Sequence, residues 1–152
     1  MTRLEDLRRQ GLLQDIAPDP AATARLLDDA RGHLRTARLA VRESDLAGAY
    51  QLAYDAARKA CTATLAARGL RVRGQGAHAN LILIMQELYG HAPGARALEQ
   101  LDRMRRTRNL AEYHGYPVDP AELEEDLAAA GDIVAAAEKI VGPKKADWSQ
   151  NR

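Results

Sequence analysis

Two nearly identical tetrapeptides predict the starts of two long amphipathic helices, and these helices limit the fold more than any other feature. Asp19-Pro20-Ala21-Ala22 and Asp119-Pro120-Ala121-Glu122 each place an N-cap aspartate before a proline at the first helical position. Glu122 stands at the third helical position and is expected to complete a capping box. Apolar residues then recur at helical spacing: Leu27, Ala30, Leu34, Ala37 and Val41 after the first motif, and Leu123, Leu127, Ala130, Val134, Ala137 and Val141 after the second.

The segment between these two helices predicts a third long helix with a narrow, small-residue face. Ser44 or Asp45 caps its start, and Gly69 is its stop signal. Its inner stripe comprises Leu46, Ala49, Tyr50, Ala53, Ala57, Ala60, Cys61 and Thr64. Because most of these side chains are small, neighbouring helices are expected to approach this one closely.

Three further helices complete the predicted fold. Residues 81–85 are apolar on every side, so a short helix over 77–89 is expected at the centre of the molecule, covered by the others. A break at Pro93-Gly94 then precedes the helix that ends near His114, and a short leading helix covers 2–13. No strand alternation competes with these periodicities. The sequence predicts an all-α fold, an antiparallel bundle of four to five main helices together with the short leading helix.

The length of the chain predicts a single domain, and its net charge predicts no overall electrostatic attraction to nucleic acid. A chain of 152 residues suits a single hydrophobic core. We divide the chain into a short helix and linker (1–19), the bundle (20–142) and a flexible tail (143–152). Lys and Arg number 22 against 21 acidic residues, a formal net charge of +1. Any binding of phosphate must therefore come from a local patch.

Cysteine usage and hydropathy indicate a cytoplasmic protein without a membrane segment. Cys61, the single cysteine, lies among alanines and is expected to be a reduced core residue. No apolar run approaches the length of a membrane span, and no signal-like segment begins the chain. Metal-ligand spacings such as HExxH or CxxC do not occur, so neither a metal nor a cofactor is expected.

One arginine occupies a position where the bundle should have an apolar side chain. On a helical wheel, Arg108 falls on the inner stripe that is formed by Ala97, Leu101, Met104 and Ala111. An isolated charge there is costly, so Arg108 should be paired, at a subunit interface or facing a polar cleft. Glu112 can reach it from one turn on, whereas Arg103 and Arg106 are expected in solvent. A purely structural ion pair remains an open interpretation.

The residues around Arg108 resemble the signature of the HEPN superfamily. Arg108-Asn109-Leu110-Ala111-Glu112-Tyr113-His114 is similar to its motif of an arginine, often a polar residue, and a histidine after four to six intervening positions; here there are five. The motif lies at the end of a helix of an all-α chain, as in that superfamily. The stretch from Ala49 to Ile82 also resembles its second helix and the following loop. The likeness covers about 20–141, and it is strongest to small stand-alone bacterial members.

The resemblance implies a homodimer in which the two Arg/His motifs line a shared cleft. In many members this cleft is a metal-independent endoribonuclease site that acts on RNA, in toxins or in stress and defence systems. Arg108 would hold the scissile phosphate, and His114 would move the proton of the 2′-hydroxyl or of the leaving 5′-oxygen. Asn109 would orient the phosphate or His114, Glu112 would support Arg108, and Arg105 would bind phosphate.

The resemblance also suggests partners other than RNA. His114-Gly115-Tyr116 is similar to the extension of HEPN toxins whose tyrosine is adenylylated by a nucleotidyltransferase antitoxin, so Tyr116 is a candidate for modification. The toxin motif has four residues between arginine and histidine, not five. Two alternatives therefore stay open: a noncatalytic HEPN-like module that binds a nucleotide or a nucleotidyltransferase, and a helical adaptor in which Arg108 closes an ion pair.

The basic loop 68–76 is the other segment of interest. Arg71 and Arg73 are expected to contact RNA phosphates, although the loop lacks a phosphate-loop pattern and a plain connector is the competing interpretation. His78, at the start of the next helix, is interpreted as a capping or packing residue.

Overall fold

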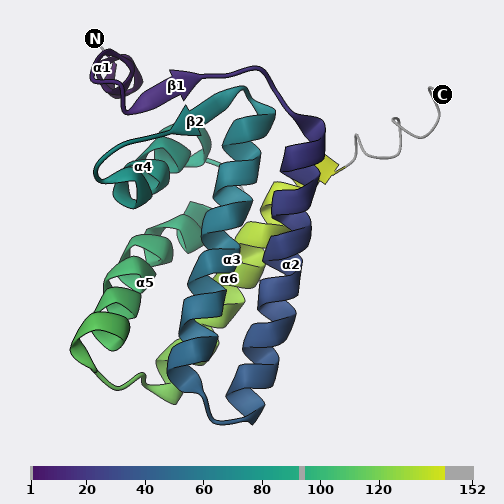
Figure 1. The fold of residues 1–152 in the computed structure, drawn as a ribbon, viewed down its shortest axis with the longest axis vertical. Coiled ribbons are helices and arrows are strands. Elements are labelled where there is room, and N and C mark those ends of the chain that lie inside the picture. The colour runs from purple at the N-terminus through teal and green to yellow at the C-terminus, as the bar shows by residue number, and fades with distance from the viewer. Residues whose placement is uncertain (1, 93–94, 143–152) are drawn as a thin grey trace, which may run out of the picture.

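The computed structural model describes residues 2–92 and 95–142, which form a helical bundle with a two-stranded sheet at one end (Figure 1). The helices are α1 (Arg3–Arg9), α2 (Pro20–Arg42), α3 (Leu46–Ala67), α4 (Ala77–Tyr89), α5 (Ala95–His114) and α6 (Pro120–Val141). This confirms the predicted all-α fold. The predicted break at Pro93-Gly94 and the predicted tail 143–152 lie outside the described residues.

Helix α3 is the central element of the bundle, with α2, α5 and α6 around it (Figure 1). Its alanines at 53, 56, 57, 60 and 63 have no exposed surface, so the neighbouring backbones pack closely against it. All of the predicted inner stripe is buried except Leu46, which is partly buried. Cys61 belongs to this core, as expected, and burial raises the pKa of its thiol to about 12.

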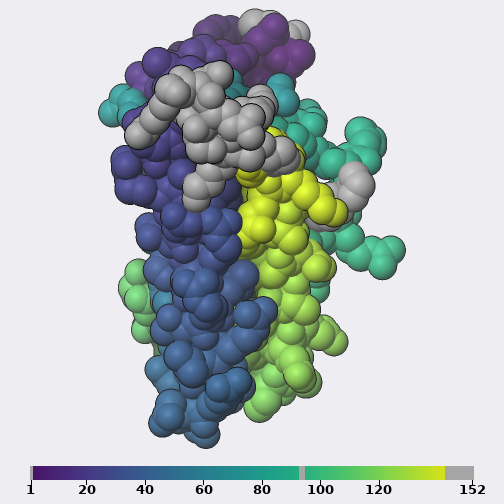
Figure 2. Space-filling model, turned by 90° about the vertical axis from the view of Figure 1, so that its right-hand side faces the viewer, coloured from purple at the N-terminus to yellow at the C-terminus, as the bar shows by residue number. Residues whose placement is uncertain are grey.

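Helices α2 and α6 pack side by side on the face of the molecule opposite α5 (Figure 2). α2 runs antiparallel to both α3 and α6 (Figure 1). The buried positions of α2 include Leu27, Ala30, Leu34 and Ala37, as its periodicity predicted. Val41, at the last turn, is 39% exposed because the helix there reaches the end of the bundle.

Aspartates precede α2, α3 and α6, but only two of these three use their side chains as caps. Asp19 accepts a hydrogen bond from the Ala22 backbone N–H, and Asp45 accepts one from that of Gly48. Asp119 makes no side-chain cap, so the predicted capping box is wrong. Glu122 points instead to α5, where it accepts a hydrogen bond from Arg103 at 2.6 Å.

A small antiparallel sheet corrects the predicted end of the leading helix and the predicted character of the loop 68–76. The leading helix stops at Arg9 rather than at residue 13, and β1 (Leu13–Asp15) follows it. β1 pairs with β2 (Leu70–Val72), which lies inside the basic loop 68–76, where no strand is expected from the sequence. Gly69 precedes β2 with φ +78°, and a Cβ there would lie 2.9 Å from the Ile16 carbonyl oxygen. Three-residue strands carry too little alternation to be recognised in the sequence.

Helix α4 has the predicted bounds but a different place in the fold. It lies at the side of the bundle, not at its centre, and its main contacts are with α3, α5 and β2 (Figure 1). Leu81, Ile82, Ile84 and Met85 are buried, and Leu83 is partly buried. Its apolar sequence reflects contact with two long helices and a strand of the small sheet rather than a central position.

Candidate functional site

Arg108 lies on the inner face of α5, as its spacing predicted. The buried residues of this helix are Ala97, Leu98, Leu101 and Met104. Arg108 continues their stripe one turn further, and its side chain is only 17% exposed. The guanidinium therefore stands at the edge of the core, where an uncompensated charge would be destabilising.

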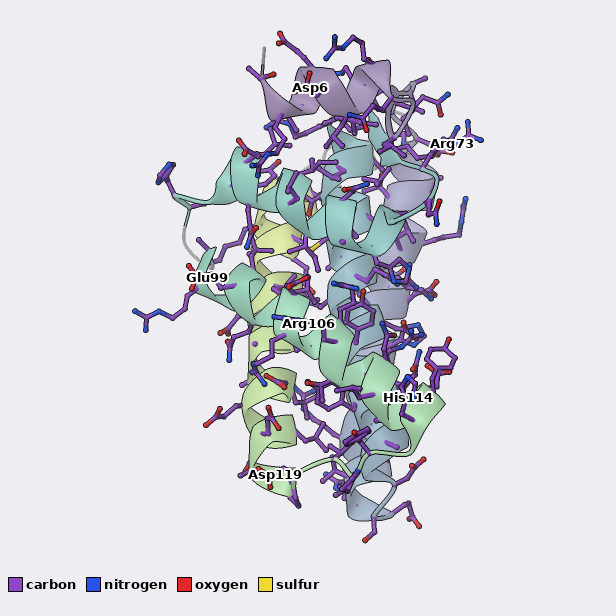
Figure 3. The ribbon with its side chains drawn as sticks, turned by 90° about the vertical axis from the view of Figure 1, so that its left-hand side faces the viewer. Asp6, Arg73, Glu99, Arg106, His114 and Asp119 are labelled. Atoms are coloured by element: carbon purple, nitrogen blue, oxygen red, sulfur yellow. The ribbon has the colours of Figure 1, made fainter. Side chains whose placement is uncertain are left out.

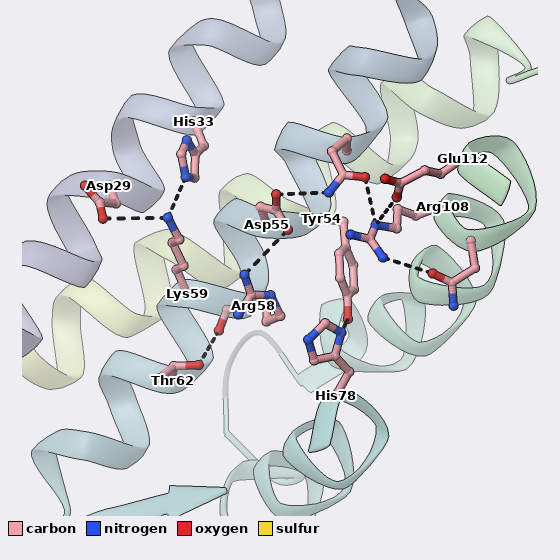
Figure 4. A network of polar contacts seen from close by, with 12 residues as sticks. Asp29, His33, Tyr54, Asp55, Arg58, Lys59, Thr62, His78, Arg108 and Glu112 are labelled. Atoms are coloured by element: carbon pink, nitrogen blue, oxygen red, sulfur yellow. Dashed lines mark hydrogen bonds and ion pairs between the residues drawn. The ribbon is translucent and has the colours of Figure 1, made fainter. Parts of the chain in front are cut away.

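Three polar side chains compensate the charge of Arg108 (Figure 4). Its Nε donates a hydrogen bond to Gln51 Oε1 at 2.8 Å, and its Nη1 donates one to Asn109 Oδ1 at 3.0 Å. Glu112 Oε2 lies 3.3 Å from Nε, which confirms the predicted pair one helical turn apart. Asn109 thus contacts Arg108 directly.

An aromatic ring forms the floor of this arrangement. The guanidinium carbon of Arg108 lies 5.6 Å from the centre of the Tyr54 ring, within the range of a cation–π interaction. Tyr54 is buried on α3, and burial raises the pKa of its hydroxyl to about 12. The Tyr54 hydroxyl lies 3.2 Å from His78 Nδ1, in the first turn of α4. Figure 4 shows Arg108 and His78 on either side of this one phenol.

Two more arginines surround the same tyrosine. Arg58 pairs with Asp55 at 3.6 Å, and Arg105 pairs with Asp102 at 3.2 Å. Among the described residues, the buried Nε of Arg58 has no hydrogen-bond partner. Partial burial lowers the pKa of His78, and the charges of Arg58, Arg108 and Arg105 lower it further. The predicted phosphate-binding residue Arg105 is therefore part of the Arg108 neighbourhood.

His114 is not among the polar partners of Arg108 in the described part of the chain. It is the last residue of α5 and is exposed, and Gly115 ends the helix with φ +68° (Figure 3). No hydrogen bond links His114 to Arg108 in residues 2–92 and 95–142, so the pairing of the two stays a prediction. Tyr116, the predicted modification site, is 60% exposed just beyond this end.

Arg71 and Arg73 belong to a different part of the surface. Both are exposed and donate hydrogen bonds to Gln14 Oε1 across the small sheet, at 2.6 and 3.4 Å. Figure 3 shows Arg73 near the sheet end of the molecule and His114 far along its long axis. The structure brings Arg105 and Asn109 to Arg108, but it does not bring Arg71 and Arg73 there.

Arg103 was expected in solvent, but it pairs with a buried carboxylate. Its guanidinium binds both carboxylate oxygens of Asp126 on α6 and also Glu122. The Asp126 side chain has no exposed surface. Asp126 accepts a further hydrogen bond of 2.5 Å from the Tyr50 hydroxyl on α3. Burial and this contact with Asp126 raise the pKa of Tyr50. Arg106, by contrast, is exposed as predicted.

Sequence reasoning missed the groups of α3 and α4 that surround Arg108 and Tyr54. Gln51, Tyr54 and Arg58 follow one another at three- and four-residue spacing, so they form a polar stripe beside the alanine face of α3. This polar stripe could have been recognised in the sequence from its helical spacing. His78 had no comparable one, because its contact with Tyr54 depends on how α4 packs against α3.

Other features of the described residues add no second centre of this kind. They contain no group of three or more His, Cys, Asp or Glu side chains placed to hold a metal ion. A cavity of about 480 Å³ lies where α2 begins and α6 ends, lined by residues such as Leu27 and Ile140, and it includes none of the Arg108 contacts. Every helix in 2–92 and 95–142 is too short or too polar to cross a lipid bilayer.

Comparison with known proteins gives one match. The HEPN domain family matches residues 23–145, which includes all of α3 to α6 and the Arg108 contacts. No match was found among curated proteins or among solved structures. Because the matched region is most of the chain and carries the Arg108–His114 motif, this protein belongs to the HEPN family.

Proposed function

We propose that the chain is a metal-independent endoribonuclease that acts on RNA at a composite site in a homodimer cleft, in a toxin or defence setting. The observation that carries this proposal is the placement of Arg108 in a HEPN chain. Its guanidinium is held over Tyr54 at the edge of the core, and its Nη2 has no hydrogen-bond partner among the described residues. A fixed guanidinium with a free edge suits a phosphate oxygen.

Arg108 and His114 have the chemistry that cleavage of RNA requires. The 2′-oxygen attacks phosphorus and loses its proton, the bond to the 5′-oxygen breaks, and that oxygen gains a proton. Arg108 stabilises the charge that develops on the nonbridging oxygens. His114 takes the proton or supplies it. Asn109 keeps the guanidinium in the orientation that this contact needs.

The ion pair between Glu112 and Arg108 supports this role, because a substrate phosphate can take the place of the carboxylate. Its side chain is 44% exposed, and its contact with Arg108 is an ion pair at 3.3 Å. A phosphate that arrives at Arg108 can displace the carboxylate into solvent at small cost, since exposed ion pairs contribute little stability. Gln51 and Asn109 still hold Nε and Nη1 when Glu112 leaves.

A second copy of the chain supplies what one chain lacks. HEPN domains often act as dimers, and no hydrogen bond links His114 to Arg108 within the described residues of one chain. Leu110, Tyr113 and Tyr116 are 44, 68 and 60% exposed at the same end of α5 as His114. These apolar and aromatic surfaces are suited to burial in an interface. We propose that this end of α5 lies at the dimer seam.

A second candidate function rests on the exposure of Tyr116. Its hydroxyl group is on a 60% exposed side chain two residues after His114, where a nucleotidyltransferase can reach it. In this alternative the chain is a noncatalytic module that binds a nucleotide or a nucleotidyltransferase at the same surface. Such a module shows nucleotide-dependent thermal stabilisation and no cleavage of RNA.

The test is cleavage of RNA in the presence of EDTA by variants of α5. Arg108→Ala and His114→Ala are expected to lower the rate by about 10²- to 10³-fold while far-UV circular dichroism stays unchanged. Arg106→Ala is the matched control, because Arg106 is on the same helix and its side chain is 66% exposed. Equal rates for wild type and His114→Ala would refute the catalytic role.

A further inference from the structure

His78 faces the same phenol as Arg108, from another helix. Its Nδ1 lies 3.2 Å from the Tyr54 hydroxyl, and Arg108 lies over the Tyr54 ring (Figure 4). The two ring planes of Tyr54 and His78 are tilted by 46°, with their centres 5.9 Å apart. Tyr54 is buried and therefore holds His78 in a fixed place relative to Arg108.

The contact between the Tyr54 hydroxyl and Nδ1 favours one position of the imidazole proton of His78. The raised pKa of Tyr54 keeps its hydroxyl protonated, and its partner among the described residues is His78 Nδ1. In the tautomer in which this hydroxyl donates, Nδ1 is the acceptor of a neutral imidazole. The proton of that imidazole is on Nε2, which turns away from Tyr54 and has no hydrogen-bond partner among the described residues.

The charges around His78 favour this neutral form. Arg58 on α3 and Arg105 and Arg108 on α5 lower the pKa of His78, and Asp55 on α3 acts in the opposite direction. His78 then adds no charge of its own near neutral pH but does present a donor. A neutral N–H beside several guanidinium groups is suited to an anionic oxygen.

We propose that His78 is an RNA-binding residue of the Arg108 site, whose Nε2–H donates to a backbone phosphate next to the one that Arg108 holds. This inference rests on the proposed function for its choice of ligand. The family motif contains only residues of α5, whereas His78 extends the site across Tyr54 to α4. The path of the RNA then runs from the end of α5 toward the start of α4.

Two substitutions separate this role from simple packing against Tyr54. In His78→Asn the amide occupies the position of Nδ1, so the contact with Tyr54 is kept and the donor at Nε2 is lost. In His78→Gln an amide N–H reaches the position of Nε2. A packing role predicts that Asn is the better replacement, and an RNA-binding role predicts that Gln is.

The experiment measures the affinity for a fluorescein-labelled single-stranded RNA in EDTA, with His114→Ala in every chain to prevent cleavage. His78→Asn is expected to bind about tenfold more weakly, and His78→Gln less than about threefold more weakly. His91→Asn, at an exposed histidine after α4, is the matched control and should bind as the parent does. The inference is wrong if His78→Asn binds like His91→Asn, or if the parent does not bind this RNA.

The same experiment keeps the two proposals apart. A wild-type chain that binds RNA but does not cut it contradicts the ribonuclease, and the order of the Asn and Gln affinities still decides the role of His78. Nitrogen-15 spectra of the wild-type imidazoles give an answer that needs no variant. We expect the Nε2–H tautomer of His78 at pH 7 and a shift of its Nε2 signal when the RNA is added. An Nδ1–H tautomer, or an unchanged signal, overturns the inference.

Discussion

Two polar clusters lie on α5, and they differ in how they hold an arginine. Arg103 binds Asp126, which is fully buried between α3, α5 and α6 and also accepts a hydrogen bond from Tyr50. Arg108 has a partly exposed carboxylate, Glu112, and an uncharged partner, Gln51. The first cluster is closed by its own residues, whereas the second leaves a guanidinium edge and a histidine nitrogen for something else.

This difference separates a structural ion pair from a candidate binding site on one helix. In the Asp126 cluster, loss of Arg103 leaves the fully buried Asp126 carboxylate without a charged partner. In the Arg108 cluster, the acidic partner Glu112 is 44% exposed, so an incoming phosphate can replace it. The location of an arginine on a buried face is therefore not sufficient evidence of function; the burial of its partners decides.

The largest expected effect is the loss of stability in Arg103→Ala. Asp126 is then left buried with only the Tyr50 hydroxyl, and the free energy of unfolding should fall by about 3 kcal/mol, the low end for a broken buried pair because Arg103 itself is partly exposed. Arg108→Ala should change it by less than about 1 kcal/mol. Urea unfolding measures both. Equal losses in the two variants would remove the contrast between the clusters.

A pair of matched hydroxyl deletions should have a smaller effect. Tyr50→Phe takes a donor from buried Asp126 and should lower the free energy of unfolding by about 1–3 kcal/mol. Tyr54→Phe removes the hydroxyl that contacts His78 at the surface, and the free energy of unfolding should fall by less than about 1 kcal/mol. Thermal unfolding of the two variants under one condition gives the comparison. A larger loss for Tyr54→Phe would mean that the Arg108 cluster is the structural one.

The pH dependence of stability should show the smallest effect. Because the pKa of His78 is lowered in the folded state, the unfolded chain binds its proton more readily as pH falls. The contribution of His78 is therefore complete above about pH 6.5, its unfolded pKa, and is lost below it as pH passes through the folded value. The difference in unfolding free energy between wild type and His78→Asn should decrease over this window. A difference independent of pH would contradict the lowered pKa.

The helices, and Arg108 within them, could be predicted because their signals are local. Proline and aspartate define the starts of α2 and α6, and the wheel placed Arg108 on the inner stripe of α5. The pairing of Arg108 with Glu112 followed from their four-residue spacing. These features depend on residues a few positions apart, which sequence periodicity records directly.

The misplaced groups depend on contacts between distant segments. Arg103 was expected in solvent, but α6 packs against that side of α5 and brings Asp126 to it, 23 residues further on. Glu122 left its expected cap for the same reason. His78 meets Tyr54 from 24 positions away, through the packing of α4 on α3. Helical spacing carries no information on which neighbour covers a polar face.

The central claim is that Arg108 of one chain acts with His114 of a second, and mixing two inactive variants tests it most directly. Arg108→Ala and His114→Ala proteins are combined at concentrations where light scattering shows dimers, and RNA cleavage in EDTA is measured. Mixed dimers keep one intact arginine and one intact histidine on different chains. The account predicts that cleavage reappears in the mixture although each variant alone is inactive. Mixed dimers that form and remain inactive would contradict it.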